Sequence, residues 1–87
     1  MKVIDIKDYN SGDGTLIDVD EAESYKQKHP YGAVSVPYEK LMANYKKVLN
    51  KDKSYFIYCT RGIRSKKCVS VLEFYGYDVT LVTHENK

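Results

Sequence analysis

Three observations predict an α/β fold with a largely parallel sheet. Short apolar segments alternate along the chain with segments of helical periodicity. Residues 54–58 (Ser-Tyr-Phe-Ile-Tyr) are mostly apolar, as expected of a strand that is buried on both faces of a parallel sheet. The 87 residues, of which 43% are apolar, suffice for one small globular domain, and they contain no repeat or linker.

The first half of the chain predicts three strands and one helix. The expected elements are a strand at 3–4, a turn-rich loop at 9–14, a strand at 16–19, a helix at 21–28 and a strand at 33–36. Asp20 can cap the helix, with Glu23 three positions later as its capping-box partner. The helix is expected to end before Pro30, because the residue before a proline disfavours the helical region.

The second half predicts two helices and two strands. The expected elements are a helix at 38–49, a polar turn at 50–53, a strand at 54–58, a helix at 65–75, a strand at 78–82 and a polar tail at 83–87. Tyr45 recurs with apolar residues at helical spacing, which places it in the core. Cys68 lies on the apolar face of the later helix and is expected to be a buried structural thiol. Gly76 ends this helix.

The charge is unevenly distributed, although the net charge is only +2. Residues 1–44 carry eight acids and five lysines, whereas residues 45–87 carry nine basic residues and four acids. The basic second half favours a small anionic substrate or an acidic partner protein. Nucleic-acid binding is not expected, because the charge excess is small and no basic–aromatic stripe is present.

The sequence carries no sign of a membrane segment or of export. No apolar run approaches the about 20 residues of a membrane-spanning helix, and the N-terminus lacks the apolar core of a signal peptide. We therefore expect a cytoplasmic protein that is a monomer or a weak dimer. Two cysteines in this setting do not suggest a disulfide scaffold. Without a cluster of cysteine or histidine ligands, we expect no metal site and no cofactor.

Residues 59–65 (Cys-Thr-Arg-Gly-Ile-Arg-Ser) give the strongest indication of function. Cys59 follows the predicted strand 54–58 at its carboxyl end, where open α/β sheets bind their ligands. Backbone N–H groups of the loop can converge on its sulfur, and the helix that follows adds the positive end of its dipole. We therefore expect Cys59 to be a thiolate nucleophile, since the thiolate is the reactive form of cysteine.

The residues after the nucleophile are expected to bind the substrate, and they are Thr60, Arg61, Gly62, Ile63, Arg64 and Ser65. Arg61 and Arg64 supply positive charge for an anionic substrate. Gly62 supplies the positive φ that a tight loop needs, at little steric cost. The alternative is a buried core thiol beside solvated arginines. Two arginines and a glycine within five residues suit such a site poorly.

Residues 59–64 resemble the active-site loop of rhodanese-type sulfurtransferases, which follows the pattern Cys-x-x-Gly-x-Arg. Three further segments resemble this family in the same order: 16–19 its Asp-Val strand, 29–37 its His-Ile-Pro-Gly-Ala-Ile-Asn-Ile-Pro segment and 75–79 its Gly-Phe/Tyr-x-x-Val segment. Four motifs in order, at the family's spacing, make the resemblance strong. It implies a single rhodanese-like domain over 1–87, with a three-layer α/β/α fold and a five-stranded, mainly parallel sheet.

The resemblance also implies the chemistry of Cys59. The thiolate would accept the outer sulfur of a small anionic donor such as thiosulfate and release sulfite. The resulting persulfide would then give its sulfur to a thiol, to cyanide or to a sulfur-acceptor protein. Asp18 is expected either to orient Arg64 or the loop, or to make only local hydrogen bonds, and His29 is expected to tie a helix end to the next strand. His84, in the polar tail, is expected to take no part.

The chain departs from the family pattern at several positions. Asp20 and Ser24 stand where the family commonly has an arginine and a glutamate that form an ion pair. Lys28 replaces a glycine before the motif histidine. Thr60 stands where the large two-domain enzymes often have an arginine, which leaves the choice of sulfur donor open.

Two other functions compete with sulfur transfer. Protein phosphatases and arsenate reductases use a similar thiolate loop, but theirs has five residues between cysteine and arginine, whereas four separate Cys59 from Arg64. The loop is therefore one residue too short to enclose a tetrahedral oxyanion. The other alternative is a non-catalytic or sulfur-relay module, on which a protein partner docks at the basic face near Lys66 and Lys67.

Overall fold

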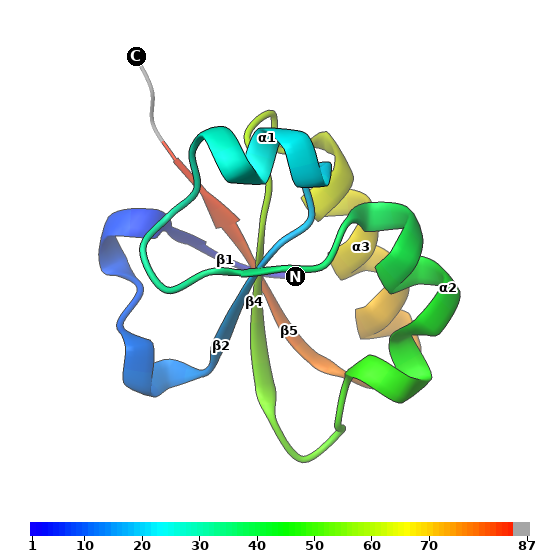
Figure 1. Cartoon of the computed structure of the whole chain (residues 1–87). Coiled ribbons are helices and arrows are strands. Elements are labelled where there is room, and N and C mark those ends of the chain that lie inside the picture. Colours follow the sequence, from blue (N-terminus) through cyan, green and yellow to red (C-terminus); the bar gives the residue numbers. More distant parts are fainter. Residues whose placement is uncertain (85–87) are drawn as a thin grey trace.

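The computed structural model describes residues 1–84 and contains a five-stranded sheet in which every pair of neighbouring strands is parallel. The strand order is β1-β5-β4-β2-β3 (Figure 1). The strands are β1 (Lys2–Asp5), β2 (Thr15–Asp18), β3 (Val34–Ser35), β4 (Ser54–Tyr58) and β5 (Asp78–Thr83). This arrangement confirms the predicted α/β fold with its parallel sheet, and it places β4 at the centre.

Helices and short turns cover both faces of the sheet. The helices are α1 (Ala22–Gln27), α2 (Tyr38–Val48) and α3 (Ile63–Phe74), and two 3₁₀ turns cover Ile6–Asp8 and Ser11–Asp13. Helices α2 and α3 lie together on one face (Figure 1). On the other face, the first 3₁₀ turn and Tyr25 of α1 pack against a smaller apolar cluster. The layer that covers this other face of the sheet is therefore thin, because α1 is its one α-helix within the described residues and is short.

Alternation along β2 shows how the sheet is buried on both faces. Leu16 packs in the smaller cluster with Ala33, whereas the next residue, Ile17, packs in the larger cluster with Leu41 and Leu72. All five side chains are at most 6% exposed. Because successive side chains of a strand point to opposite faces, a single strand contributes to both apolar clusters.

Several predicted boundaries differ from the structure. Helix α3 begins at Ile63 rather than Ser65, because Gly62 turns the chain with a φ of 82° and forms the N-cap. The predicted strand 33–36 is reduced to two residues, and the predicted loop 9–14 contains a 3₁₀ turn. The predicted capping box of α1 is wrong, since Glu21 is the N-cap and no side chain caps the helix.

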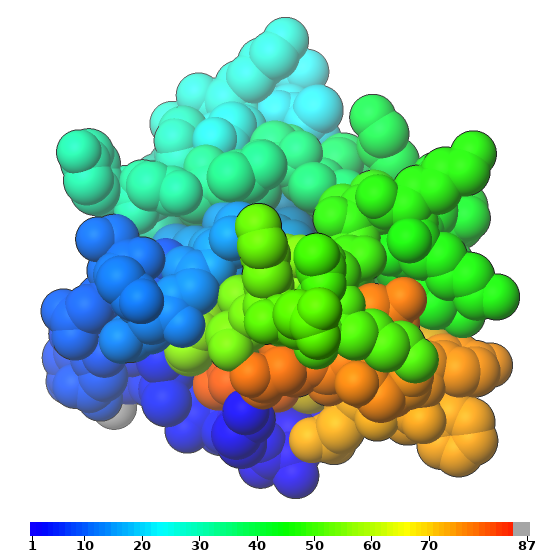
Figure 2. Space-filling view, turned by 90° about the horizontal axis from the view of Figure 1, so that it is seen from below, coloured from blue at the N-terminus to red at the C-terminus, as the bar shows by residue number. Residues whose placement is uncertain are grey.

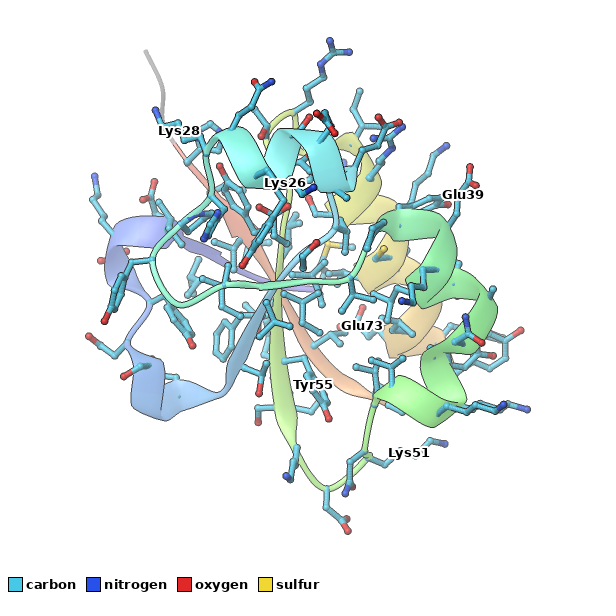
Figure 3. The ribbon with its side chains drawn as sticks, in the orientation of Figure 1. Lys26, Lys28, Glu39, Lys51, Tyr55 and Glu73 are labelled. Atoms are coloured by element: carbon cyan, nitrogen blue, oxygen red, sulfur yellow. The ribbon has the colours of Figure 1, made fainter. Side chains whose placement is uncertain are left out.

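The predicted core residues Cys68 and Tyr45 lie on the side of the sheet that α2 and α3 cover. Cys68 is completely buried, and Tyr45 is half-buried against the same cluster. The buried Tyr55 of β4 (Figure 3) accepts a hydrogen bond of 2.8 Å from the backbone N–H of Asn50. This contact fixes the connection from α2 to β4.

The end of the molecule that Figure 2 shows is where the strands begin. Here the segment that joins α2 to β4 lies beside the start of β5. The Lys51 ammonium is 5.2 Å from the ring centroid of Tyr77, which holds the two connections together. Cys59 follows the last residue of β4, at the opposite end of the sheet. Within residues 1–84, no helix has the length and apolar character needed to cross a membrane.

Gly14 precedes β2 at a point where two backbone segments pass closely. A Cβ atom at this position would lie 2.5 Å from the carbonyl oxygen of Ser54 and 3.0 Å from the ring of Phe56. We therefore expect Gly14→Ala to lower the free energy of unfolding by about 1–3 kcal/mol, as overpacking does elsewhere. Urea denaturation followed by circular dichroism measures this change.

Gly12→Ala is the matched control, because a Cβ atom at Gly12 would meet nothing within 4 Å. This variant should change the free energy of unfolding by less than about 0.5 kcal/mol. Equal stabilities for the two variants would show that the close approach at Gly14 does not constrain the fold.

Candidate active site

Cys59 lies directly after β4, and its sulfur faces the turn that leads into α3. The backbone N–H groups of Gly62 and Ser65 point at Sγ, with nitrogen–sulfur distances of 3.1 and 3.3 Å. The Ser65 hydroxyl lies 3.3 Å from the same sulfur and donates to the carbonyl of Gly62. Amide groups that converge in this way stabilise negative charge on the atom they surround.

The thiol lies at the base of a cavity of about 650 Å³. The residues that line this cavity are Asp20, Glu21, Ser24, Cys59, Thr60, Arg61, Ile63 and Arg64. Cys59 is only 2% exposed, so a substrate has to bring its reacting atom down to the sulfur. The cavity volume falls within the range of small-molecule sites, about 300 to 1,000 Å³.

Both predicted arginines line the cavity, together with two acids. Nη2 of Arg64 lies 3.4 Å from Oε2 of Glu21, in a solvent-accessible ion pair. Arg61 also borders a neighbouring apolar groove. The predicted positive loop is therefore partly balanced by carboxylates from the segment that follows β2.

Asp20 is a site residue whose role the sequence analysis missed. Its carboxylate accepts hydrogen bonds from the backbone N–H of Thr60, at 3.0 and 3.2 Å, and from the Thr60 hydroxyl at 2.7 Å. It is 7% exposed. Asp20 thus holds the residue next to Cys59 rather than capping α1. The signal for this contact lies in the strand order. Asp20 follows β2 and Thr60 follows β4, and the carboxyl ends of neighbouring parallel strands lie at the same edge of a sheet.

Asp18 makes a local hydrogen bond and does not reach Arg64. Its Oδ1 accepts from the backbone N–H of Asp20 at 2.8 Å, and the side chain is completely buried. Oδ2 has no hydrogen-bond partner among residues 1–84. Burial raises the pKa of Asp18 to about 6, and the nearby carboxylate of Asp20 adds to the rise, while the backbone hydrogen bond opposes it. Of the two roles expected for Asp18, the structure shows the local hydrogen bond.

The two histidines, His29 and His84, lie in different parts of the structure. Nδ1 of His29 lies 2.7 Å from the carbonyl oxygen of Tyr25, and the two rings are stacked at 3.8 Å. The Tyr25 hydroxyl donates to the carbonyl of Ala33, so this group links the end of α1 to the segment before β3. His84 lies with Nε2 2.7 Å from the carbonyl oxygen of Thr60. His84 therefore contacts the loop that carries Cys59, and the expectation that it takes no part in the function stays a prediction.

Comparison with known proteins agrees with this fold. The family model described as "Rhodanese-like domain" matches residues 5–84. A rhodanese-related protein from Thermoplasma volcanium is 26% identical, with a TM-score of 0.87 over 97% of this chain and 85% of that one. A rhodanese-like domain protein from Staphylococcus aureus is 25% identical, with a TM-score of 0.80 over 97% of this chain and 86% of that one.

A third similar structure belongs to a much longer chain. The reduced Bacillus anthracis CoADR-RHD is 27% identical, with a TM-score of 0.83, and the match covers 93% of this chain but 15% of that one. No significant match was found among curated protein sequences.

The buried carboxyl of Asp18 predicts a pH-dependent stability that Asp18→Asn removes. An unfolded aspartic acid ionises near pH 4, whereas the raised pKa of about 6 keeps this carboxyl protonated in the folded state. Between these values the unfolded state binds fewer protons, so the wild-type free energy of unfolding should fall as the pH rises. The expected fall from this group is on the order of 1–3 kcal/mol.

Urea titrations at several pH values between about 4 and 7 test this prediction. The stability of Asp18→Asn relative to wild type should increase as the pH rises to about 6 and then stay constant, because Asp18 is ionised above its pKa. A difference that does not change with pH would show that Asp18 has an ordinary pKa.

Proposed function

The chain belongs to the rhodanese-like domain family, and we propose that it is a sulfurtransferase of the thiosulfate sulfurtransferase type, with Cys59 as the sulfur carrier. The proposal rests mainly on the two backbone N–H groups that point at Sγ from 3.1 and 3.3 Å. Preorganised donors of this kind stabilise the thiolate before the reaction and the persulfide between its two steps. The cytoplasmic location remains a prediction.

Two displacements at sulfur complete the proposed reaction. The Cys59 thiolate attacks the outer sulfur of an anionic donor such as thiosulfate, and the donor S–S bond breaks with its electron pair on the departing sulfite. An acceptor thiolate or cyanide then attacks the outer sulfur of the persulfide, and Cys59 leaves as a thiolate. No oxidant, reductant or general base is needed, which fits covalent catalysis by an ionised nucleophile.

Arg61 and Arg64 line the cavity that contains Cys59, so they can hold the anionic end of the donor. The side chain of Arg64 is 46% exposed and that of its partner Glu21 is 70% exposed. Exposed ion pairs are weak, so a substrate anion can compete with Glu21 for Arg64. The Ser65 hydroxyl, 3.3 Å from Sγ, gives the sulfur a further polar neighbour.

Intact mass spectrometry after incubation with thiosulfate tests the assignment of Cys59. The wild-type protein should gain about 32 Da, the mass of one sulfur, and cyanide should remove this increment. Cys59→Ser should show no gain, whereas Cys68→Ala should gain the same mass. Cys68 is completely buried, and burial raises the pKa of its thiol to about 12. A gain that persists in Cys59→Ser would place the persulfide elsewhere.

We further propose that the acceptor is an acidic protein with a thiol on an extended tail. A groove of about 860 Å³ adjoins the cavity, and Arg61 and Ile63 line both. Its apolar lining includes Met1, Val3 and Val71, which are 53%, 52% and 37% exposed. These side chains give a partner molecule apolar surface to pack against.

Basic residues border this groove and indicate the charge of the partner. Lys66 and Lys67 lie in the first turns of α3 and line the groove with Arg61. An acidic and apolar tail fits this surface, and a thiol at its end would then lie near the mouth of the cavity. Complementary charge at such a border mainly raises the rate of association.

Charge reversal at Lys66 and Lys67 tests the docking surface. Two synthetic peptides that end in cysteine serve as acceptors, one with alternating aspartate and leucine, the other with lysine in place of aspartate. The double variant Lys66→Glu, Lys67→Glu should slow sulfur transfer to the acidic peptide by about five- to tenfold, because two attractive charges are reversed. The rate is measured by the mass of the persulfidated peptide.

Lys46→Glu, Lys47→Glu is the matched control, since these lysines are adjacent on α2 and line neither the groove nor the cavity. This variant should transfer sulfur to the acidic peptide at the wild-type rate. If both double variants slow transfer equally, the effect comes from net charge and the groove is not the docking surface.

A further inference from the structure

We propose that the cavity above Cys59 is selective for a persulfide donor that carries both a carboxylate and an ammonium group, such as the persulfide of an α-amino acid. The proposal rests on sulfur transfer at Cys59 and names the class of donor. Its basis is the combination of two cations and two anions around the cavity, namely Arg61, Arg64, Asp20 and Glu21.

The charges in the cavity already have partners in this structure, with Arg61 as the exception. Both carboxylate oxygens of Asp20 accept hydrogen bonds from Thr60. Arg64 lies 3.4 Å from Glu21. Arg61 makes no ion pair with any of the residues 1–84. The cavity is therefore close to neutral rather than strongly positive.

An inorganic dianion is poorly matched to this arrangement. Thiosulfate can bind Arg61 and Arg64, but it offers no cation to the carboxylate of Glu21. The carboxylates of Glu21 and Asp20 line the same cavity as the bound dianion, and like charges in one cavity repel each other. Binding of thiosulfate therefore adds two negative charges to a cavity that already holds two acids.

A donor with both charges gives every group a partner. Its carboxylate can bind Arg61 and Arg64, which present planar donors suited to a carboxylate. Its ammonium can bind Glu21, whose side chain is 70% exposed and has one ion-pair partner in the structure. A carboxylate can accept several hydrogen bonds at once, so Glu21 can contact the ammonium while it remains near Arg64.

The proposed step is balanced without a further reactant. The Cys59 thiolate attacks the terminal sulfur of R–S–SH, the S–S bond of the donor breaks, and R–S⁻ leaves with the electron pair. The proton stays on the transferred sulfur, which becomes the outer sulfur of the Cys59 persulfide. The transferred sulfur keeps its oxidation level, so neither an oxidant nor a reductant is consumed.

A matched pair of donors tests the proposal in the wild-type protein. The persulfides of cysteine and of mercaptopropionate share a carboxylate and a persulfide, and they differ in the ammonium group. We expect the second-order rate of Cys59 persulfide formation to be about three- to tenfold higher with cysteine persulfide, as one exposed ion pair allows. The rate is followed by intact mass, with thiosulfate as a third donor.

The variant Glu21→Gln tests whether Glu21 binds the ammonium group of the donor. This variant should lose the preference for cysteine persulfide over mercaptopropionate persulfide and should react faster with thiosulfate. Glu23→Gln removes the same charge from α1 at a position that does not line the cavity, so it should keep the wild-type preference. Circular dichroism confirms that both variants are folded.

The outcomes separate this proposal from the proposed function. If none of the three donors adds sulfur to Cys59, the sulfurtransferase function itself is wrong. If all three react but the wild-type protein does not distinguish the matched pair, sulfur transfer stands and the ammonium selectivity is wrong. Retention of the preference in Glu21→Gln would also overturn the role of Glu21.

Discussion

The approach of two backbone N–H groups to the sulfur of Cys59 constrains the whole site. One group belongs to Gly62, the N-cap of α3, and the other to Ser65 in the first turn of this helix, so the nucleophile, the turn and the helix have to fold as one unit. Gly62 makes this possible, because its φ of 82° is a conformation that other residues adopt at a steric cost. The polar surroundings of the sulfur thus come from the main chain and from the buried Ser65.

The side chains around this main-chain site are supplied mainly by two neighbouring strands. β4 leads to the cysteine and both arginines, whereas β2 leads to Asp20 and Glu21. Since β2 and β4 are parallel neighbours, their carboxyl ends bring acids and bases to one edge of the sheet. The charge of the cavity is therefore set by sheet order, and it differs from the positive charge of the loop alone.

The sequence was a good guide wherever local patterns decide the structure. The strand at 54–58 was predicted with the correct ends, because a polar turn precedes it and the cysteine loop follows it. The start of α3 was predicted two residues late, since the role of Gly62 as N-cap depends on its backbone conformation. Local rules also assigned Asp20 to helix capping, although its true partner, Thr60, lies 40 residues away in the sequence. Long-range contacts of this kind follow from strand order, which single-residue patterns do not encode.

The contact between His84 and Thr60 has a practical consequence for work on this protein. His84 follows β5 directly, and its imidazole touches the carbonyl of the residue next to the nucleophile. A fluorophore or resin linkage attached at His84 would therefore report on, or obstruct, the reactive loop itself. The exposed side chain of Lys53 precedes the first residue of β4, at the end of the strand opposite Cys59, and offers an attachment point remote from the chemistry.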